Sequence, residues 1–209
     1  MVNNLLAIVI SYFIGSIPTG YILGRWVKGI DIRDFGSGNV GATNSFRVLG
    51  KGYGIVVLLV DILKGLFVVV AIGNLFQVHV YGCIILGLFA VIGHNWSIFL
   101  KFRGGKGIAT TLGVLMGFSI QVPSVGLVLL VCVMTWLLVF IISGYVSLAS
   151  MIASIMLPIS LVVTNHAIPW VLLGVVICLM VVIRHRPNIK RLLEGQEPRA
   201  ISPFTFKRH

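Results

Sequence analysis

Residues 36–44 read GSGNVGATN, and Arg47 follows three residues later. Glycine allows positive φ, so a glycine-rich loop can turn successive backbone N–H groups toward one anion. Neutral donors are supplied by Ser37, Asn39, Thr43 and Asn44. A plain turn between two helices is the alternative, but such a turn needs only about two to five residues. The segment is not a Walker loop, because GxxxxGK[ST] is absent, and it predicts an anion site of another kind.

The segment 101–110, KFRGGKGIAT, combines three cations with three glycines. A helix is expected to start near Ile108, and Lys106 between two glycines can reach a phosphate as a point charge. The alternative is that the cations only keep the loop on the cytoplasmic side of a membrane. That alternative explains the lysines and the arginine but not the paired glycines, so we favour a phosphate site.

The third polar segment, 184–197, reads RHRPNIKRLLEGQE. Pro187 is expected to end the last apolar helix, which would place His185 and Asn188 at its mouth. From its type alone, His185 is a base, a hydrogen-bond donor or a bystander.

Three ionisable residues lie inside or at the end of apolar runs. Asp61 and Lys64 are three residues apart, so they can pair on one helix face. The pair is either functional or a structural ion pair that fixes helix packing, and we favour the structural reading. His94 either shapes a site or fills a helix contact. No HExxH motif, Cys/His cluster or pair of carboxylates occurs, so no metal is predicted.

The composition indicates the elements that must position these residues. The chain is 58% hydrophobic and 10% charged, with a mean hydropathy of +1.07, whereas soluble domains are about 25% charged. The apolar runs do not alternate with polar residues, so a helical integral membrane protein is predicted rather than a barrel. The net charge of +11 sits in short clusters between apolar runs. This placement argues against nucleic acid and favours cytoplasmic loops.

Apolar runs at 4–24, 53–73 and 80–100 each have the length of one span. Residues 107–183 contain no Asp, Glu, Lys or Arg and fit four short helices, with breaks near 121–123, 143–144 and 165–169. If basic clusters are cytoplasmic, an even number of spans separates each pair of clusters. We therefore predict an all-α bundle of seven transmembrane helices, with the N-terminus outside and the C-terminus in the cytoplasm. The chain 1–209 forms one domain with a short basic tail, 184–209, and its three polar motifs face the cytoplasm.

GSGNVGATN, GGKGIAT and IRHRPNIKRLLEGQE, in this order, resemble the three cytoplasmic motifs of the bacterial PlsY family over essentially the whole chain. These enzymes are membrane acyl-phosphate–glycerol-3-phosphate acyltransferases. The resemblance implies transfer of a fatty acyl group from acyl phosphate to the 1-hydroxyl of glycerol 3-phosphate, giving lysophosphatidic acid and phosphate, the first step of phospholipid synthesis. It also implies the bacterial plasma membrane, a cytoplasm-facing site, no cofactor, and a soluble partner that forms acyl phosphate.

The resemblance also assigns roles to residues. The first motif binds phosphate through Ser37, Arg47 and the loop backbone, and the second holds glycerol 3-phosphate through Lys106 and its glycines. The third brings His185 and Asn188 to the reacting centre, while Glu197 ties the tail loop to a basic partner. The substrate-binding set is then Gly36, Ser37, Gly38, Asn39, Gly41, Thr43, Asn44, Arg47, Gly104, Gly105, Lys106 and Gly107.

The first two motifs contain no carboxylate base, and no serine or cysteine stands beside an activating dyad. The base is either His185 or a phosphate oxygen of the donor, and we favour the phosphate, with His185 and Asn188 orienting it. One alternative function is a transporter or channel for a phosphorylated solute, which predicts inverted repeats that the sequence does not show. Another is a non-catalytic lipid-binding protein, which would not need three such motifs.

Overall fold

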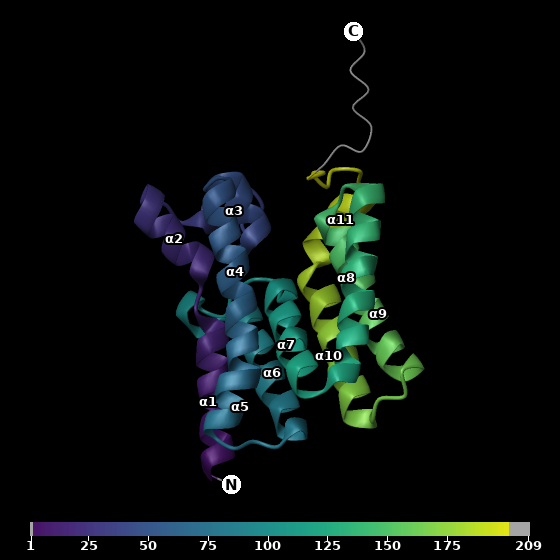
Figure 1. Cartoon of the computed structure of the whole chain (residues 1–209). Coiled ribbons are helices and arrows are strands. Elements are labelled where there is room, and N and C mark those ends of the chain that lie inside the picture. The colour runs from purple at the N-terminus through teal and green to yellow at the C-terminus, as the bar shows by residue number, and fades with distance from the viewer. Residues whose placement is uncertain (1, 201–209) are drawn as a thin grey trace. The chain divides into compact units, whose positions relative to one another are not determined.

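In a computed structural model, residues 2–200 are described, apart from the side chain of Val2. Within this range every regular element is helical (Figure 1). The elements are α1 (Val2–Ser16), α2 (Thr19–Lys28), η1 (Ile32–Asp34), α3 (Ala42–Val48), α4 (Lys51–Phe67), η2 (Val68–Ile72), α5 (Gly73–Leu75), α6 (Val80–Asn95), η3 (Ile98–Leu100), α7 (Ile108–Gln121), α8 (Pro123–Ser143), α9 (Val146–Val163), α10 (Ile168–Arg184) and α11 (Arg186–Leu193).

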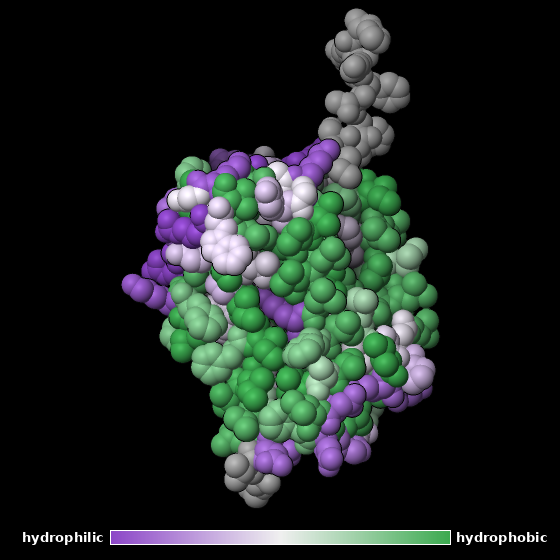
Figure 2. Space-filling model, turned by 60° about the vertical axis from the view of Figure 1, so that its left-hand side comes forward, coloured by the Kyte–Doolittle hydropathy of each residue, from purple (hydrophilic) through white to green (hydrophobic). Residues whose placement is uncertain are grey.

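Five helical stretches are long and apolar enough to cross a membrane. They are Asn3–Lys28, Lys51–Leu75, Val80–Leu100, Pro123–Ser143 and Val146–Val163. The bent pair α10 and α11 makes a sixth if it counts as one span, while α7 is a shorter apolar helix. Hydrophobic side chains cover the flanks of the helices, and hydrophilic ones gather toward their ends (Figure 2). The all-helical class is confirmed, whereas the count of seven spans and their orientation stay predictions.

The breaks expected in the long uncharged region coincide with helix ends. α7 starts at Ile108 and ends at Gln121, and α8 begins at Pro123. Gly144 follows α8 with φ +74, and Asn165 between α9 and α10 has φ +54. Both conformations are left-handed, where a helix cannot continue. The first apolar run, 4–24, lies within one candidate span, Asn3–Lys28, whose helix is interrupted between α1 and α2 because Pro18 lacks an N–H to donate.

The chain divides into two compact units, Met1–Gly126 and Leu127–His209, and the division falls in the first turn of α8. The single domain expected over 1–209 stays a prediction, and each unit is considered by itself. The first unit holds the first two motifs, and the second unit holds the third.

In the first unit, α1 packs against α6 and α4 packs against α7. Glycines let these helices approach closely: a Cβ on Gly93 would clash with the backbone of Tyr12 in α1, and one on Gly113 with the backbone of Ile62 in α4. Close approach through small residues is the usual means of helix association in a membrane, where burial of apolar surface gives little driving force. The two helix pairs thereby pack closely within the first unit, which carries the first two motifs.

In the second unit, α9 packs against α10, and Trp136 of α8 donates a hydrogen bond from Nε1 to Oγ of Ser150 in α9 at 3.1 Å. α10 and α11 meet at His185 with a bend of 58°. Pro187 lies in the first turn of α11, where its missing N–H costs nothing. As expected, the last apolar helix ends next to Pro187.

Candidate active site

The first motif forms a loop whose backbone is set by glycine and asparagine. Gly36 and Gly38 have φ of +60 and +69, which is the left-handed region that glycine tolerates. Oδ1 of Asn44 accepts a hydrogen bond from the N–H of Ser37 at 2.8 Å, and its Nδ2 donates to the carbonyl of Phe35 at 3.0 Å. Asn44 is buried, and it holds residues 36–38 at the exposed tip of the loop.

The remaining predicted residues of the first motif lie around this tip. Oδ1 of Asn39 accepts a hydrogen bond from the N–H of Gly41 at 2.9 Å, which closes a local turn. Thr43 is half-buried in the first turn of α3, and Arg47 is exposed in its last turn. The structure thus presents Ser37 and Arg47 at the surface of the first unit.

An ion pair frames the loop on its N-terminal side. Nη2 of Arg33 lies 2.6 Å from Oδ2 of Asp31, and the N–H of Arg33 donates to Oδ1 of the same carboxylate at 3.0 Å. The side-chain hydrogen bond from Arg33 is the main reason that the pKa of Asp31 falls to about 2, although burial acts in the opposite direction. On the far side of the loop, Nζ of Lys28 donates to the carbonyl of Val48 at 2.6 Å, at the C-terminus of α3. A cation there complements the helix dipole.

The first two motifs share a small hydrophobic core. Val40 of the first motif is 5% exposed and Leu100, directly before the second motif, is 2% exposed. Both belong to one cluster with Ile32 and Leu49. The burial of these four side chains fixes the first loop beside the second.

The second motif lies directly on the end of α6. The N–H of Gly105 donates to the carbonyl of His94 at 2.9 Å, and the N–H of Gly104 donates to the carbonyl of Asn95 at 3.2 Å. A Cβ on Gly105 would stand 2.7 Å from Cε1 of His94, inside contact distance. Position 105 therefore accommodates only glycine, because a side chain there would clash with the imidazole of His94.

The second loop ends at the N-terminus of α7. Gly107 is the N-cap residue with φ +81, and Gly104, Gly105 and Gly107 are all buried. Lys106 is half-buried between them. The first N–H groups of a helix lack partners within the helix and favour an anion, and α7 has no acidic residue in its first turn. The arrangement can hold a phosphate with a lysine and a helix N-terminus together.

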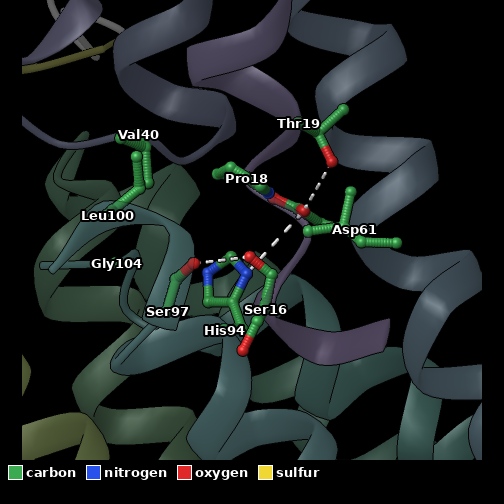
Figure 3. A pocket seen from close by; sticks show the side chains of 10 residues that line it. Ser16, Pro18, Thr19, Val40, Asp61, His94, Ser97, Leu100 and Gly104 are labelled. Atoms are coloured by element: carbon green, nitrogen blue, oxygen red, sulfur yellow. Dashed lines mark hydrogen bonds and ion pairs between the residues drawn. The ribbon is translucent and has the colours of Figure 1, made fainter. Parts of the chain in front are cut away.

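A small cavity of about 10 Å³, lined by polar and apolar residues, lies between the first two motifs and helices α4 and α6. Its walls include Thr19, Val40, Asp61, His94 and Gly104 (Figure 3). This volume is about that of one water and is far too small for a phosphorylated substrate.

The third motif is organised within the second unit. His185 is 3% exposed, and its Nδ1 lies 2.8 Å from the carbonyl oxygen of Val181. A carbonyl can only accept, so His185 carries a proton on Nδ1, and in the neutral ring Nε2 has the lone pair. The ring is thereby fixed as a tautomer that can accept a hydrogen bond or a proton through Nε2.

Glu197 connects α9 and α11 of the second unit. Its Oε1 accepts hydrogen bonds from Nδ2 of Asn188 and from Oγ of Ser147, and its Oε2 accepts one from Nε of Arg191, each at 2.7 Å. Burial alone would raise the pKa of Glu197, but these hydrogen bonds outweigh burial and lower it. The carboxylate thus orients the side chain of Asn188, and Arg191 is its basic partner.

Some of these contacts had no signal in the sequence. Ser147 stands 50 residues from Glu197 and lies in an apolar helix, so nothing marked it as a partner. Lys64 lies 2.8 Å from Oδ1 of Asp61, as the spacing predicts, but it also contacts His94, 30 residues away. Among residues 2–200, no group of three or more His, Cys, Asp or Glu side chains could hold a metal ion.

A family model described as "Glycerol-3-phosphate acyltransferase" matches residues 5–195. The chain is 45% identical over 190 residues to the glycerol-3-phosphate acyltransferase of Fusobacterium nucleatum, which covers 91% of this chain and 94% of the relative. It is 47% identical over 196 residues to glycerol-3-phosphate acyltransferase 2 of Moorella thermoacetica, covering 92% and 95% of the two chains.

Two solved structures are also similar. Both are crystal structures of PlsY (YgiH), described as an integral membrane glycerol 3-phosphate acyltransferase. The glycerol 3-phosphate form is 39% identical, with a TM-score of 0.84 over 94% of each chain. The lysophosphatidic acid form is 38% identical, with a TM-score of 0.82 over 96% of each chain.

Proposed function

The chain belongs to the glycerol-3-phosphate acyltransferase family, and from this premise we propose its reaction and the residues that perform it. The chain is a multi-pass membrane acyltransferase. It transfers a fatty acyl group to the 1-hydroxyl of glycerol 3-phosphate and produces lysophosphatidic acid. The observation that carries this conclusion is the match of 94% of the chain to PlsY in its glycerol 3-phosphate form, at a TM-score of 0.84.

We propose acyl phosphate as the donor. Its phosphate is a good leaving group, so the chain needs no covalent acyl-enzyme, and neither of the first two motifs supplies a nucleophile with an activating base. Both substrates then carry a phosphate group. The two glycine-rich loops of the first unit offer one anion site each, which agrees with that requirement.

The exposed tip of the first loop receives one phosphate group. Ser37 supplies a hydroxyl there and Arg47 a guanidinium, while Gly36 and Gly38 shape the tip, because the N–H groups of Ser37 and Gly38 already donate within the loop. Asn39, Gly41, Thr43 and Asn44 hold the shape of this loop rather than forming the main contacts. This division follows from the burial of Asn44 and from the internal hydrogen bonds of Asn39 and Asn44.

The second loop receives glycerol 3-phosphate. Lys106 contacts the phosphate as a point charge, while Gly104, Gly105 and Gly107 allow close backbone approach. The N-terminus of α7 adds the positive end of a helix dipole to the same place. Because residues 101–107 contain no carboxylate, the loop does not repel a dianionic substrate.

The chemical step is a direct transfer. The 1-hydroxyl oxygen attacks the acyl carbon, the bond from that carbon to the phosphate oxygen breaks, and the proton moves to a phosphate oxygen of the donor. His185 and Asn188, the latter held by Glu197, orient the donor phosphate that takes this proton. Catalysis then consists mainly of positioning and of stabilising developing charge.

We also propose the setting of the enzyme. The three basic segments face the cytoplasm of a bacterial plasma membrane, seven spans cross the bilayer, and a soluble enzyme supplies acyl phosphate. The support for this orientation is the placement of basic residues in the motif loops and their absence from residues 74–79 and 165–167.

Product analysis tests the proposed reaction. Purified protein in lipid nanodiscs is supplied with glycerol 3-phosphate and either palmitoyl phosphate or palmitoyl-CoA, and lysophosphatidic acid is quantified by mass spectrometry. Product is expected with palmitoyl phosphate and not with palmitoyl-CoA. Equal rates with the two donors would refute the proposed donor, and no product with either would refute the proposed reaction.

A further inference from the structure

A buried charged cluster lies beneath the second loop, and the proposed chemical step does not use it. Asp61 and Lys64 of α4 are 2% and 6% exposed, and His94 of α6 is 7% exposed. Thr19 of α2 joins them through a hydrogen bond from Oγ1 to Oδ1 of Asp61 at 3.3 Å. Burying an ion pair in an apolar bundle gives little net stability, so such a group calls for another reason to be there.

Lys64 determines the state of His94. Its Nζ lies 2.8 Å from Oδ1 of Asp61, 3.2 Å from the carbonyl of Ile17 and 2.8 Å from Nδ1 of His94. An ammonium has three N–H donors and no acceptor, and these three contacts match the three donors. Nδ1 of His94 is therefore the acceptor, and the proton of the neutral ring is on Nε2.

His94 in turn determines the position of the loop. Its backbone carbonyl accepts from the N–H of Gly105 at 2.9 Å, and a Cβ on Gly105 would stand 2.9 Å from Cδ2 of the ring. The loop thus lies against both the main chain and the imidazole of one residue. The ring cannot rotate without losing Lys64, and the loop cannot approach further without displacing the ring.

The same cluster also contacts the segment that packs against the first loop. Pro18 interrupts the first apolar run, and the carbonyl of Ile17 beside it accepts from Lys64. Gly20 in the following helix packs against the carbonyl of Val40 in the first motif. Figure 3 shows Asp61 and His94 on the wall of the small cavity that also borders Val40 and Gly104. The cluster therefore contacts a segment next to each loop: residues 17–20, which pack against Val40 of the first motif, and the end of α6, which packs against Gly105 of the second.

We propose that Asp61, Lys64 and His94 are positioning residues for glycerol 3-phosphate, because Lys64 locks the imidazole of His94 against Gly105 and so sets the shape of the glycine loop. This inference rests on the proposed function of that loop. A purely structural ion pair would instead affect folding and leave substrate binding unchanged. The two roles are separable by comparing one charge removed with both removed.

The test measures the Michaelis constants of purified variants together with their melting temperatures. Lys64→Met removes the donor to His94 and leaves the carboxylate of Asp61 without its ammonium partner, so it lowers the melting temperature and raises KM for glycerol 3-phosphate. A lost charge-assisted hydrogen bond corresponds to about tenfold or more in KM. KM for acyl phosphate is expected to change by less than about twofold, because the other loop binds that substrate.

The double variant Asp61→Asn with Lys64→Met separates the roles. It leaves no unpaired buried charge, so the melting temperature recovers, but His94 still lacks its donor and KM for glycerol 3-phosphate stays raised. The double variant also serves if the single variant does not fold. A KM that returns to the wild-type value together with the melting temperature would overturn the proposal.

A matched control comes from the other end of α7. Nε2 of Gln121 donates to the carbonyl of Val69 at 3.1 Å, so Gln121→Met removes a helix-to-helix hydrogen bond far along α7 from the glycine loop. It is expected to lower the melting temperature without changing KM. An equal rise of KM in this variant would also overturn the proposal. Wild-type protein without activity in the same assay would refute the proposed function instead, so the two failures are distinct.

Discussion

Replacing Arg47 and Lys106 with alanine tests whether these cations bind substrate or only set the membrane topology. Arg47 is exposed in the last turn of α3, whereas Lys106 is half-buried between glycines that have no room for a Cβ. A charge-assisted hydrogen bond contributes about 1.5–3 kcal/mol, and about 1.4 kcal/mol corresponds to a tenfold change. Arg47→Ala is therefore expected to lower kcat/KM by about tenfold. Lys106→Ala is expected to lower it by about a hundredfold, because water is excluded more strongly there.

The assay is acyltransferase kinetics on purified variants in nanodiscs, with yield and melting temperature as controls for folding. Both variants are expected to fold, because neither side chain belongs to the helix core. Lys101→Ala is the matched control, because Lys101 is an exposed cation of the same segment that no glycine pair surrounds. Its kcat/KM is expected to stay within about twofold of wild type. Near-normal efficiency in both Arg47→Ala and Lys106→Ala would refute the phosphate-binding loops.

Three further outcomes are expected. Gly104→Ala raises KM for glycerol 3-phosphate more than KM for acyl phosphate, because its Cβ would clash with the carbonyl of His94. The control Gly52→Ala, whose Cβ meets open space, changes neither KM, and a larger rise of KM for acyl phosphate in Gly104→Ala would show that the loop binds that substrate. Because the pKa of Glu197 is lowered from 4.5, its contribution to stability is present above that pH and is lost as the pH falls through the pKa of the folded protein. The difference in melting temperature between wild type and Glu197→Gln is therefore expected to close below about pH 4.5, and a constant difference would contradict the contact network. A C-terminal alkaline phosphatase fusion, which is active only outside the cytoplasm, stays inactive, and activity would contradict the inside C-terminus.

Local chemistry explains what the sequence alone could predict. The ends of α7, α8 and α9 follow from Pro123, Gly144 and Asn165, because proline removes a donor and left-handed residues stop a helix. The start of α7 at Ile108 follows from the glycines before it. The Asp61–Lys64 pair follows from a spacing of three residues on one helix.

Contacts between distant helices could not be predicted in this way. Lys64 meets His94 only because α4 and α6 share one bundle, and Ser147 meets Glu197 only because the tail returns to the start of α9. The interruption at Pro18 within the first span was also missed, because hydropathy does not distinguish one continuous helix from two consecutive helices. These features depend on tertiary packing, which a pattern in one segment does not encode.

The stoichiometry of the reaction tests the central claim most directly. Inorganic phosphate and lysophosphatidic acid are measured in the same sample of purified protein in nanodiscs, with palmitoyl phosphate present and glycerol 3-phosphate varied. We expect one phosphate released for each lysophosphatidic acid formed, and no release when glycerol 3-phosphate is absent. Phosphate release without glycerol 3-phosphate, or release that exceeds product, would contradict direct acyl transfer between two substrates held by these loops.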